Sequence, residues 1–308
     1  MNPPMRGFIG IAAACVLLFS PVSDTRSAPN GSRGFSSREK EYLLDFQYSV
    51  MCDQPGYYEA AIREAERIGS GSSVTTEPVG VPRWGIVSHH LLIKDLIAGY
   101  FQRLAREISP QTFVIIGPNH FAEGHHRVAI SSLGWKTPFG ILPSDEHISS
   151  ALIASGAVAV DEPAFIHEHS IGALVPFIKY YFPEAHVVPI IFRSDTDTLA
   201  AASLAGALLR CGGSGVFFLA SLDFSHYKTS AVAQREDAVT LKVLEALDPA
   251  KSRNAFVDSH AAFFTVLRSC AQMGATSIEI VDHTNSGIIE NLPDAGCTSY
   301  INTIFRAP

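Results

Sequence analysis

The segment that most constrains the fold of this chain is residues 112–121, TFVIIGPNHF. Its first five residues are mostly β-branched or aromatic, which favours a buried β-strand. A Gly-Pro pair ends the strand pattern, and the polar residues Asn119 and His120 follow it. In open α/β folds, ligands bind outside the carboxyl ends of the strands. The segment therefore predicts a buried strand that delivers His120 to a binding site.

Strand-like and helix-like segments alternate along the chain from about residue 80 onwards. Besides 112–116, strands are expected at residues 85–87, 127–131, 157–160, 186–192, 216–221, 277–281 and 299–305. Most of the segments between them have the apolar spacing of amphipathic helices. This alternation predicts the α/β class, with a layered sandwich of a mixed, mostly parallel sheet flanked by helices.

The N-terminal region differs from the rest of the chain. Arg6 precedes an apolar run at residues 7–19, and small and polar residues follow, as in a secretory signal peptide. We assign residues 1–28 to a signal peptide or N-terminal anchor, 29–79 to a linker with a helical arm, and 80–308 to one α/β domain. Cys15 follows three alanines, so a lipoprotein is an alternative. We expect an exported protein, periplasmic or extracellular, with any membrane attachment only through the N-terminus.

The composition narrows the partners and the redox chemistry. A net charge of −7 argues against nucleic acid as a partner, because binding to phosphate needs a basic face. If the first cysteine is removed with a signal, Cys52, Cys211, Cys270 and Cys297 are left. An oxidising compartment permits disulfides among these four, and buried free thiols are the alternative.

Histidines and one aspartate fall where the predicted elements begin or end. Those after strands or near helix starts are His89, His120, His169, Asp223, His226 and His260. Neutral imidazole is the commonest metal ligand in proteins, and ligands from separate loops build metal sites with open positions. One such histidine alone is more often a structural group. The combination of Asp223, Ser225 and His226 lacks the nucleophile elbow of a serine hydrolase.

Five segments occur in an order and spacing that resemble a known family. They are GPNHF at 117–121, WKTPFG at 135–140, EHSIGALVPFIKYYFP at 168–183, VVPIIF at 187–192 and SLDFSHY at 221–227. The chain thereby resembles the Memo family, also called AmmeMemoRadiSam system protein B, from about residue 81 to 305. That family is similar in fold to the class III extradiol dioxygenases of the protocatechuate 4,5-dioxygenase type. The resemblance implies an α/β sandwich like that of the extradiol dioxygenases.

The resemblance also implies a metal site. Two family histidines match His89 and His120, whereas the third family ligand is a cysteine that residues 257–262 lack. We expect His260 to take its place and give a three-histidine site, with Asp258 as the rival. Replacing thiolate by imidazole favours iron, copper(II) or zinc over copper(I), so we expect one transition metal ion, iron or copper, with zinc also suitable.

The expected function is that of a metal-dependent oxidoreductase resembling the dioxygenases. In it, His169 or His226 is the acid or base, and Asp223 orients one of them. Two alternatives are open: a non-catalytic protein that binds a metal, a peptide or a small ligand, and a metal-assisted hydrolase.

Overall fold

The computed structural model describes residues 47–49, 51–69, 79–275 and 277–308, all of which belong to one compact unit, Ser37–Pro308. The predicted signal or anchor at 1–28 lies outside these residues, as does much of the predicted linker. Helix α2 (Pro55–Gly69) is the described part of the expected helical arm. Within the described ranges, every helix is too short or too polar to cross a bilayer.

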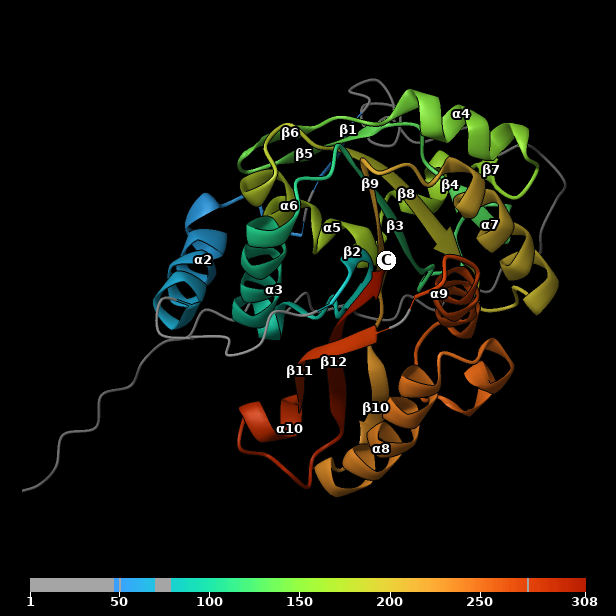
Figure 1. Ribbon diagram of the computed structural model, residues 1–308. Coiled ribbons are helices and arrows are strands. Elements are labelled where there is room, and N and C mark those ends of the chain that lie inside the picture. The colour runs from blue at the N-terminus through green and yellow to red at the C-terminus, as the bar shows by residue number, and fades with distance from the viewer. Residues whose placement is uncertain (1–46, 50, 70–78, 276) are drawn as a thin grey trace, which may run out of the picture. The chain divides into compact units, whose positions relative to one another are not determined.

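A mixed sheet forms the centre of the fold (Figure 1). Four neighbouring strands run parallel in the order β2 (Val81–Val87), β9 (Val216–Ser221), β3 (Thr112–Pro118) and β8 (His186–Phe192). Next to them run the antiparallel strands β12 (Cys297–Ala307), beside β2, and β4 (Val128–Ile130), beside β8. Shorter pairings add β7 (Ala159–Val160) to β4, and both β10 (Phe224–Lys228) and β11 (Ser277–Asn285) to β12. The predicted fold class is confirmed.

Strand β3 is buried on both faces, as its continuous apolar run predicts. Phe113 and Ile115 pack into the core on one face of the sheet. Val114 and Ile116 pack into the core on the other face. The pleat sends alternate side chains to opposite faces, so every residue of the strand contributes to one of the two cores.

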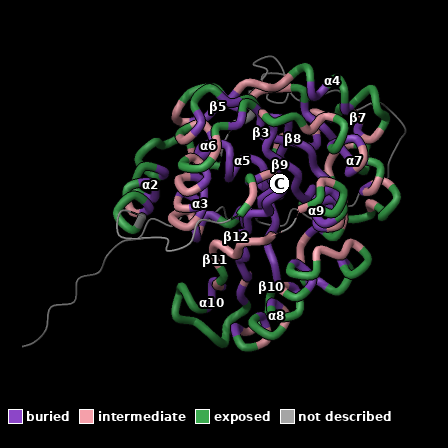
Figure 2. Tube along the Cα trace, in the orientation of Figure 1, coloured by how far each residue is buried: buried purple, intermediate pink, exposed green. Residues whose placement is uncertain are grey.

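Helices cover both faces of the sheet (Figures 1 and 2). The core around Phe113 includes side chains from α2, from α3 (Lys94–Glu107) and from α6 (Val175–Tyr181). The opposite core includes side chains from α4 (Glu146–Ala154), α7 (Thr198–Cys211) and α9 (His260–Gln272). These two cores hold the central strands rigidly and so fix the positions of the strand ends.

Some elements differ from expectation. The helix-like segment at 168–182, between the strands expected at 157–160 and 186–192, is divided into α5 (His169–Gly172) and α6, because Pro176 lacks an N–H and its ring is incompatible with a continuous helix. Residues 224–228, for which no strand was expected, form β10, which pairs with β12. A small second sheet joins β1 (Gln47–Ser49), β5 (Gly134–Thr137) and β6 (Gly140–Leu142). The part of the chain after β9 also contains helices α8 (Ser230–Ala246) and α10 (Ser286–Ile289).

The four cysteines that follow residue 46 are all free thiols. Cys270 and Cys297 are buried, and Cys52 and Cys211 are partly buried. Of the two alternatives that the sequence left open, the structure therefore has free thiols.

Candidate metal site

The loops that carry the site are held together at the carboxyl ends of the parallel strands. The Leu222 N–H donates to the Val87 carbonyl, and the Ser88 hydroxyl donates to the Leu222 carbonyl at 3.0 Å, which joins the ends of β2 and β9. The Asn119 N–H donates to the Phe192 carbonyl at 2.7 Å, which joins the ends of β3 and β8. These bonds bring the residues that follow β2 and β3 to one edge of the sheet.

Three histidines meet at this edge. One nitrogen from each of His89, His120 and His169 lies within 4.8 Å of the other two. The rings of His120 and His169 stack with centroids 4.2 Å apart, and the His89 ring stands edge-on to both. His89 is buried, whereas His120 and His169 are partly exposed, so the cluster opens to solvent on one side.

A serine fixes the tautomer of His89. The Ser221 hydroxyl donates its single proton to the Ser170 carbonyl at 2.5 Å. It therefore accepts a hydrogen bond from Nδ1–H of His89, which lies 3.0 Å away. Burial, together with the charges of His120 and His169, holds the pKa of His89 well below 6.5, so its ring is neutral. Nε2 of His89 then presents a lone pair to the cluster.

A glutamate fixes the tautomer of His120. Oε1 of Glu168 accepts from Nδ1–H of His120 at 2.8 Å and from the Ser170 N–H at 2.7 Å. Oε2 accepts from the backbone N–H of His120 at 2.7 Å. Burial opposes ionisation of Glu168, but these hydrogen bonds outweigh it and lower the pKa to about 2. The ionised carboxylate keeps the proton on Nδ1, and Nε2 of His120 is free to bind a ligand.

Two carboxylates face the buried side of the cluster. Oδ2 of Asp223 lies 3.7 Å from Nε2 of His89, and Oδ2 of Asp258 lies 3.5 Å from the same atom. The Asp223 N–H donates to Oδ2 of Asp258, and the Asp258 N–H donates to the Asp223 carbonyl. Burial raises the pKa of both carboxyls, and the neighbouring Asp223 charge raises that of Asp258 further.

The structure brings some of the predicted site residues together and leaves others apart. It brings together His89 and His120, as expected, and Asp223 lies beside them. The third member of the cluster is His169, which we expected as an acid or base. His260, expected as the third ligand, is exposed at the first residue of α9 and is not a member of the cluster in the described chain. That these residues bind a metal stays a prediction.

The start of helix α9 explains the position of His260. Ser259 caps α9, with its hydroxyl accepting from the Ala262 N–H, so His260 already belongs to the helix. Asp258 precedes the cap and is bound to the loop after β9, where an isolated bridge also joins Phe224 to Val257. The rival candidate, Asp258, is therefore the residue of this segment that lies beside His89, with Oδ2 3.5 Å from Nε2, although the three-residue cluster does not include it.

His226 and Ser221 complete the surroundings of the cluster. His226 is partly buried, and burial lowers its pKa below 6.5 although the Asp223 charge opposes this. Ser221 was missed by sequence reasoning, because the last residue of a buried strand looks structural. The signal that could have identified it is its position: it carries a hydroxyl at the end of a strand, and a histidine follows shortly after.

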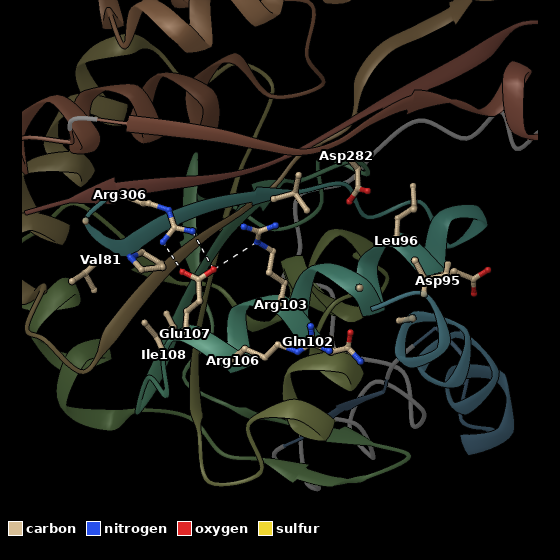
Figure 3. Close-up of a pocket in the computed structure, with 16 residues that line it drawn as sticks. Val81, Asp95, Leu96, Gln102, Arg103, Arg106, Glu107, Ile108, Asp282 and Arg306 are labelled. Carbon is tan, nitrogen blue, oxygen red and sulfur yellow. Dashed lines mark hydrogen bonds and ion pairs between the residues drawn. The ribbon is translucent and has the colours of Figure 1, made fainter. Parts of the chain in front are cut away.

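A cavity lies elsewhere in the molecule (Figure 3). It has a volume of about 770 Å³ and includes Val81 at the start of β2, whereas His89 follows the end of that strand. In it, Arg306 donates to Glu107 at 2.6 Å, and Arg103 reaches the same carboxylate at 3.6 Å. Among the described residues, the grouping of possible metal ligands lies at the histidine cluster and not in this cavity.

An α/β sandwich with a histidine cluster at its strand ends defines a class of protein, a layered α/β protein with a candidate transition-metal centre. The model of the family described as "Memo-like protein" matches residues 86–303, more than half of the chain. The chain therefore belongs to the Memo family, as the resemblance of its motifs indicated.

Individual relatives agree with this assignment. A MEMO1 family protein of Methanosarcina barkeri is 32% identical over 185 residues, which cover 57% of this chain and 69% of that protein. One of Thermoplasma volcanium is 29% identical over 229 residues, which cover 71% and 82%. Among solved structures, the uncharacterized protein JW3007 of Escherichia coli K12 has a similar fold, with a TM-score of 0.51. The two are 13% identical, and the match covers 72% of this chain and 99% of that one.

Proposed function

We propose that this protein binds one transition metal ion through His89, His120 and His169. The observation that carries the proposal is the convergence of three imidazoles, two of which have Nδ1 held by an acceptor. Two atoms that each lie ~2.1 Å from one ion are at most ~4.2 Å apart. The observed limit of 4.8 Å is slightly wider, so a small inward rotation of the rings suffices.

Elemental analysis of untagged protein tests this proposal. We expect about one equivalent of metal in the wild type and a loss of most of it in His120→Ala. His167→Ala is the matched control, because His167 pairs with Glu123 at the surface and is not part of the cluster. Equal metal content in the wild type and His120→Ala would contradict the proposal.

The chemistry that we propose is oxidation of a small molecule that chelates the ion. A bound iron or copper ion would supply Lewis acidity and redox capacity, and zinc would supply Lewis acidity alone. His226 is the proton acceptor, because burial keeps its imidazole neutral at neutral pH. Asp223, whose charge acts on His226, stabilises the imidazolium that forms when His226 takes a proton. The exposed edges of His120 and His169 give the substrate its entry side.

Oxygen uptake distinguishes this chemistry from its alternatives. We expect the iron(II)-loaded protein to consume O2 with at least one member of a catechol panel. We also expect His226→Ala to lower kcat and alter its pH profile while metal content stays normal. Metal binding without uptake across the panel would favour a non-catalytic binding protein. Hydrolysis of ester or phosphoester probes by the zinc-loaded protein would favour a hydrolase.

We also propose that the protein is exported, because the apolar run at residues 7–19 has the pattern of a signal peptide. Expression of the full chain followed by fractionation and N-terminal sequencing tests this. Recovery of the intact Met1 terminus from the cytosol would contradict it.

A further inference from the structure

A fourth histidine lies beside the cluster without belonging to it. His90 directly follows His89 and is exposed. Burial lowers the pKa of His169 and His226 and raises that of Asp223, and the charge of His90 acts on all three groups. Charges shift a pKa in this way only when they are close by. His90 therefore stands on the side of the cluster that opens to solvent.

A buried tyrosine holds the His90 ring. Nδ1 of His90 lies 2.6 Å from the Tyr300 hydroxyl oxygen, and the two ring centroids are 5.7 Å apart. Tyr300 is fully buried on β12. Burial raises the pKa of the Tyr300 hydroxyl well above its ordinary value, so this hydroxyl carries its proton at neutral pH.

The Tyr300 proton points at His90. A hydrogen bond between Ser286 and Tyr300 lowers the pKa of Tyr300 and so opposes burial, as a donor to the phenol oxygen does. The Tyr300 O–H is then free to donate to Nδ1 of His90. A neutral imidazole that accepts at Nδ1 carries its own proton on Nε2. Among the described residues, Nε2 of His90 has no hydrogen-bond partner, so it presents an unused N–H donor.

The charges around this donor favour an uncharged acceptor. Glu168 is ionised, and the carboxyls of Asp223 and Asp258 also lie beside the histidines. In the described ranges, these three carboxyls form ion pairs with histidine and none with lysine or arginine. Such surroundings repel a phosphate or a further carboxylate, whereas a carbonyl or hydroxyl oxygen accepts a hydrogen bond without adding charge.

We propose that His90 binds the substrate, with its Nε2–H donating a hydrogen bond to an uncharged carbonyl or hydroxyl oxygen of the molecule that chelates the ion. Tyr300 is a positioning residue, because it acts on the substrate only through His90. The inference rests on the proposed function and narrows its substrate class to chelators that carry one further uncharged oxygen acceptor. This bond fixes the orientation of the chelator at the open side of the cluster.

The competing interpretation is that His90 only joins the loop after β2 to β12 through Tyr300. His90→Asn separates the two, because the amide oxygen lies close to the position of Nδ1 and still accepts from Tyr300, whereas nothing replaces the Nε2–H. Tyr300→Phe keeps the imidazole but no longer fixes its tautomer. His125→Asn is the matched control, because His125 is exposed, lies outside the cluster and bonds to Asp161 through its backbone N–H.

The experiment uses the full chain loaded with zinc, which binds chelators without oxidising them. The probes are catechol and its two ring carboxamides, which add one uncharged carbonyl to the same chelating pair. We expect the wild type and His125→Asn to bind at least one carboxamide about 10-fold more tightly than catechol, because one additional hydrogen bond is worth about that factor. His90→Asn should bind this carboxamide and catechol equally, and Tyr300→Phe should show an intermediate preference. Nitrogen NMR of the metal-free wild type should place the His90 proton on Nε2.

The outcomes separate this inference from the proposed function. If the wild type has no preference for a carboxamide, or if His90→Asn keeps that preference, the inference about His90 is wrong and the metal site stands. A His90 proton found on Nδ1 would also overturn it. If zinc does not strengthen the binding of catechol to the wild type, the proposed metal site itself is wrong, and the inference falls with it.

Discussion

The Glu168→Gln substitution tests how strongly the protein holds His120 in place. Glu168 is fully buried at its side chain and accepts three hydrogen bonds, from Nδ1–H and the backbone N–H of His120 and from the Ser170 N–H. Glutamine has nearly the same shape but only one acceptor oxygen, and its amide nitrogen would face a donor. The substitution therefore removes a negative charge that three N–H donors stabilise in the folded protein.

The pKa of Glu168 gives the size of the effect. The folded protein lowers this pKa from 4.5 to about 2, and one pKa unit is worth about 1.4 kcal/mol, so ionised Glu168 contributes about 3 kcal/mol. Because the folded pKa is the lower one, this stability is fully present above the unfolded pKa and is lost as the pH falls towards 2. The contribution should be about 3 kcal/mol at pH 7 and about 1.5 kcal/mol at pH 3.

Urea unfolding of metal-free protein at several pH values measures this. We expect Glu168→Gln to lower the free energy of unfolding by up to about 3 kcal/mol at pH 7, with a gap that narrows as the solution is acidified. Glu123→Gln is the control, because Glu123 pairs with His167 at the surface and such pairs contribute at most about 1 kcal/mol. A gap that stays constant between pH 7 and pH 3 would refute the reasoning.

Three further predictions concern the same site. Gly117→Ala places a Cβ 2.8 Å from the Ser170 hydroxyl oxygen, so the free energy of unfolding measured in urea should fall by about 1–3 kcal/mol. An unchanged urea midpoint would contradict this. Ser221→Ala removes the acceptor that orients the His89 ring. If His89 binds the metal as proposed, zinc affinity measured by competition with a chelator should fall about 10- to 100-fold; wild-type affinity would show that the hydroxyl is dispensable. His260→Ala should bind zinc like the wild type, whereas His169→Ala should bind it at least about 10-fold more weakly; the reverse result would restore the original expectation for His260.

The fold could largely be predicted because the signals that define it are local. Apolar runs such as those at 112–116 and 216–221 each bury one strand, and their alternation with helices fixes the class. Pairing with distant strands is not encoded locally. Residues 224–228 look like a loop after β9, and they become β10 only because β12, some seventy residues later, offers a partner edge.

The site was predictable to the extent that its residues follow the parallel strands. His89 and His120 follow β2 and β3, and neighbouring parallel strands deliver their ends to one edge of a sheet. The third member of the cluster, His169, lies at the start of α5 and follows none of the four parallel strands, so this logic does not place it in the site. In the segment before α9, the Ser259 cap leaves His260 exposed on the helix and Asp258 beside His89.

The order of the site before any metal binds comes from one connected set of hydrogen bonds. Ser221 at the end of β9 links Nδ1 of His89 to the Ser170 carbonyl, and the Ser170 hydroxyl donates to the Pro118 carbonyl at the end of β3. Glu168, two residues before Ser170, holds His120. Both imidazoles are thus oriented through the same turn at the start of α5, and a disturbance at Gly117 or Ser221 must reach both. Because this turn also carries His169, all three rings are tied to one hydrogen-bonded turn, which would reduce the entropy lost if they bound an ion.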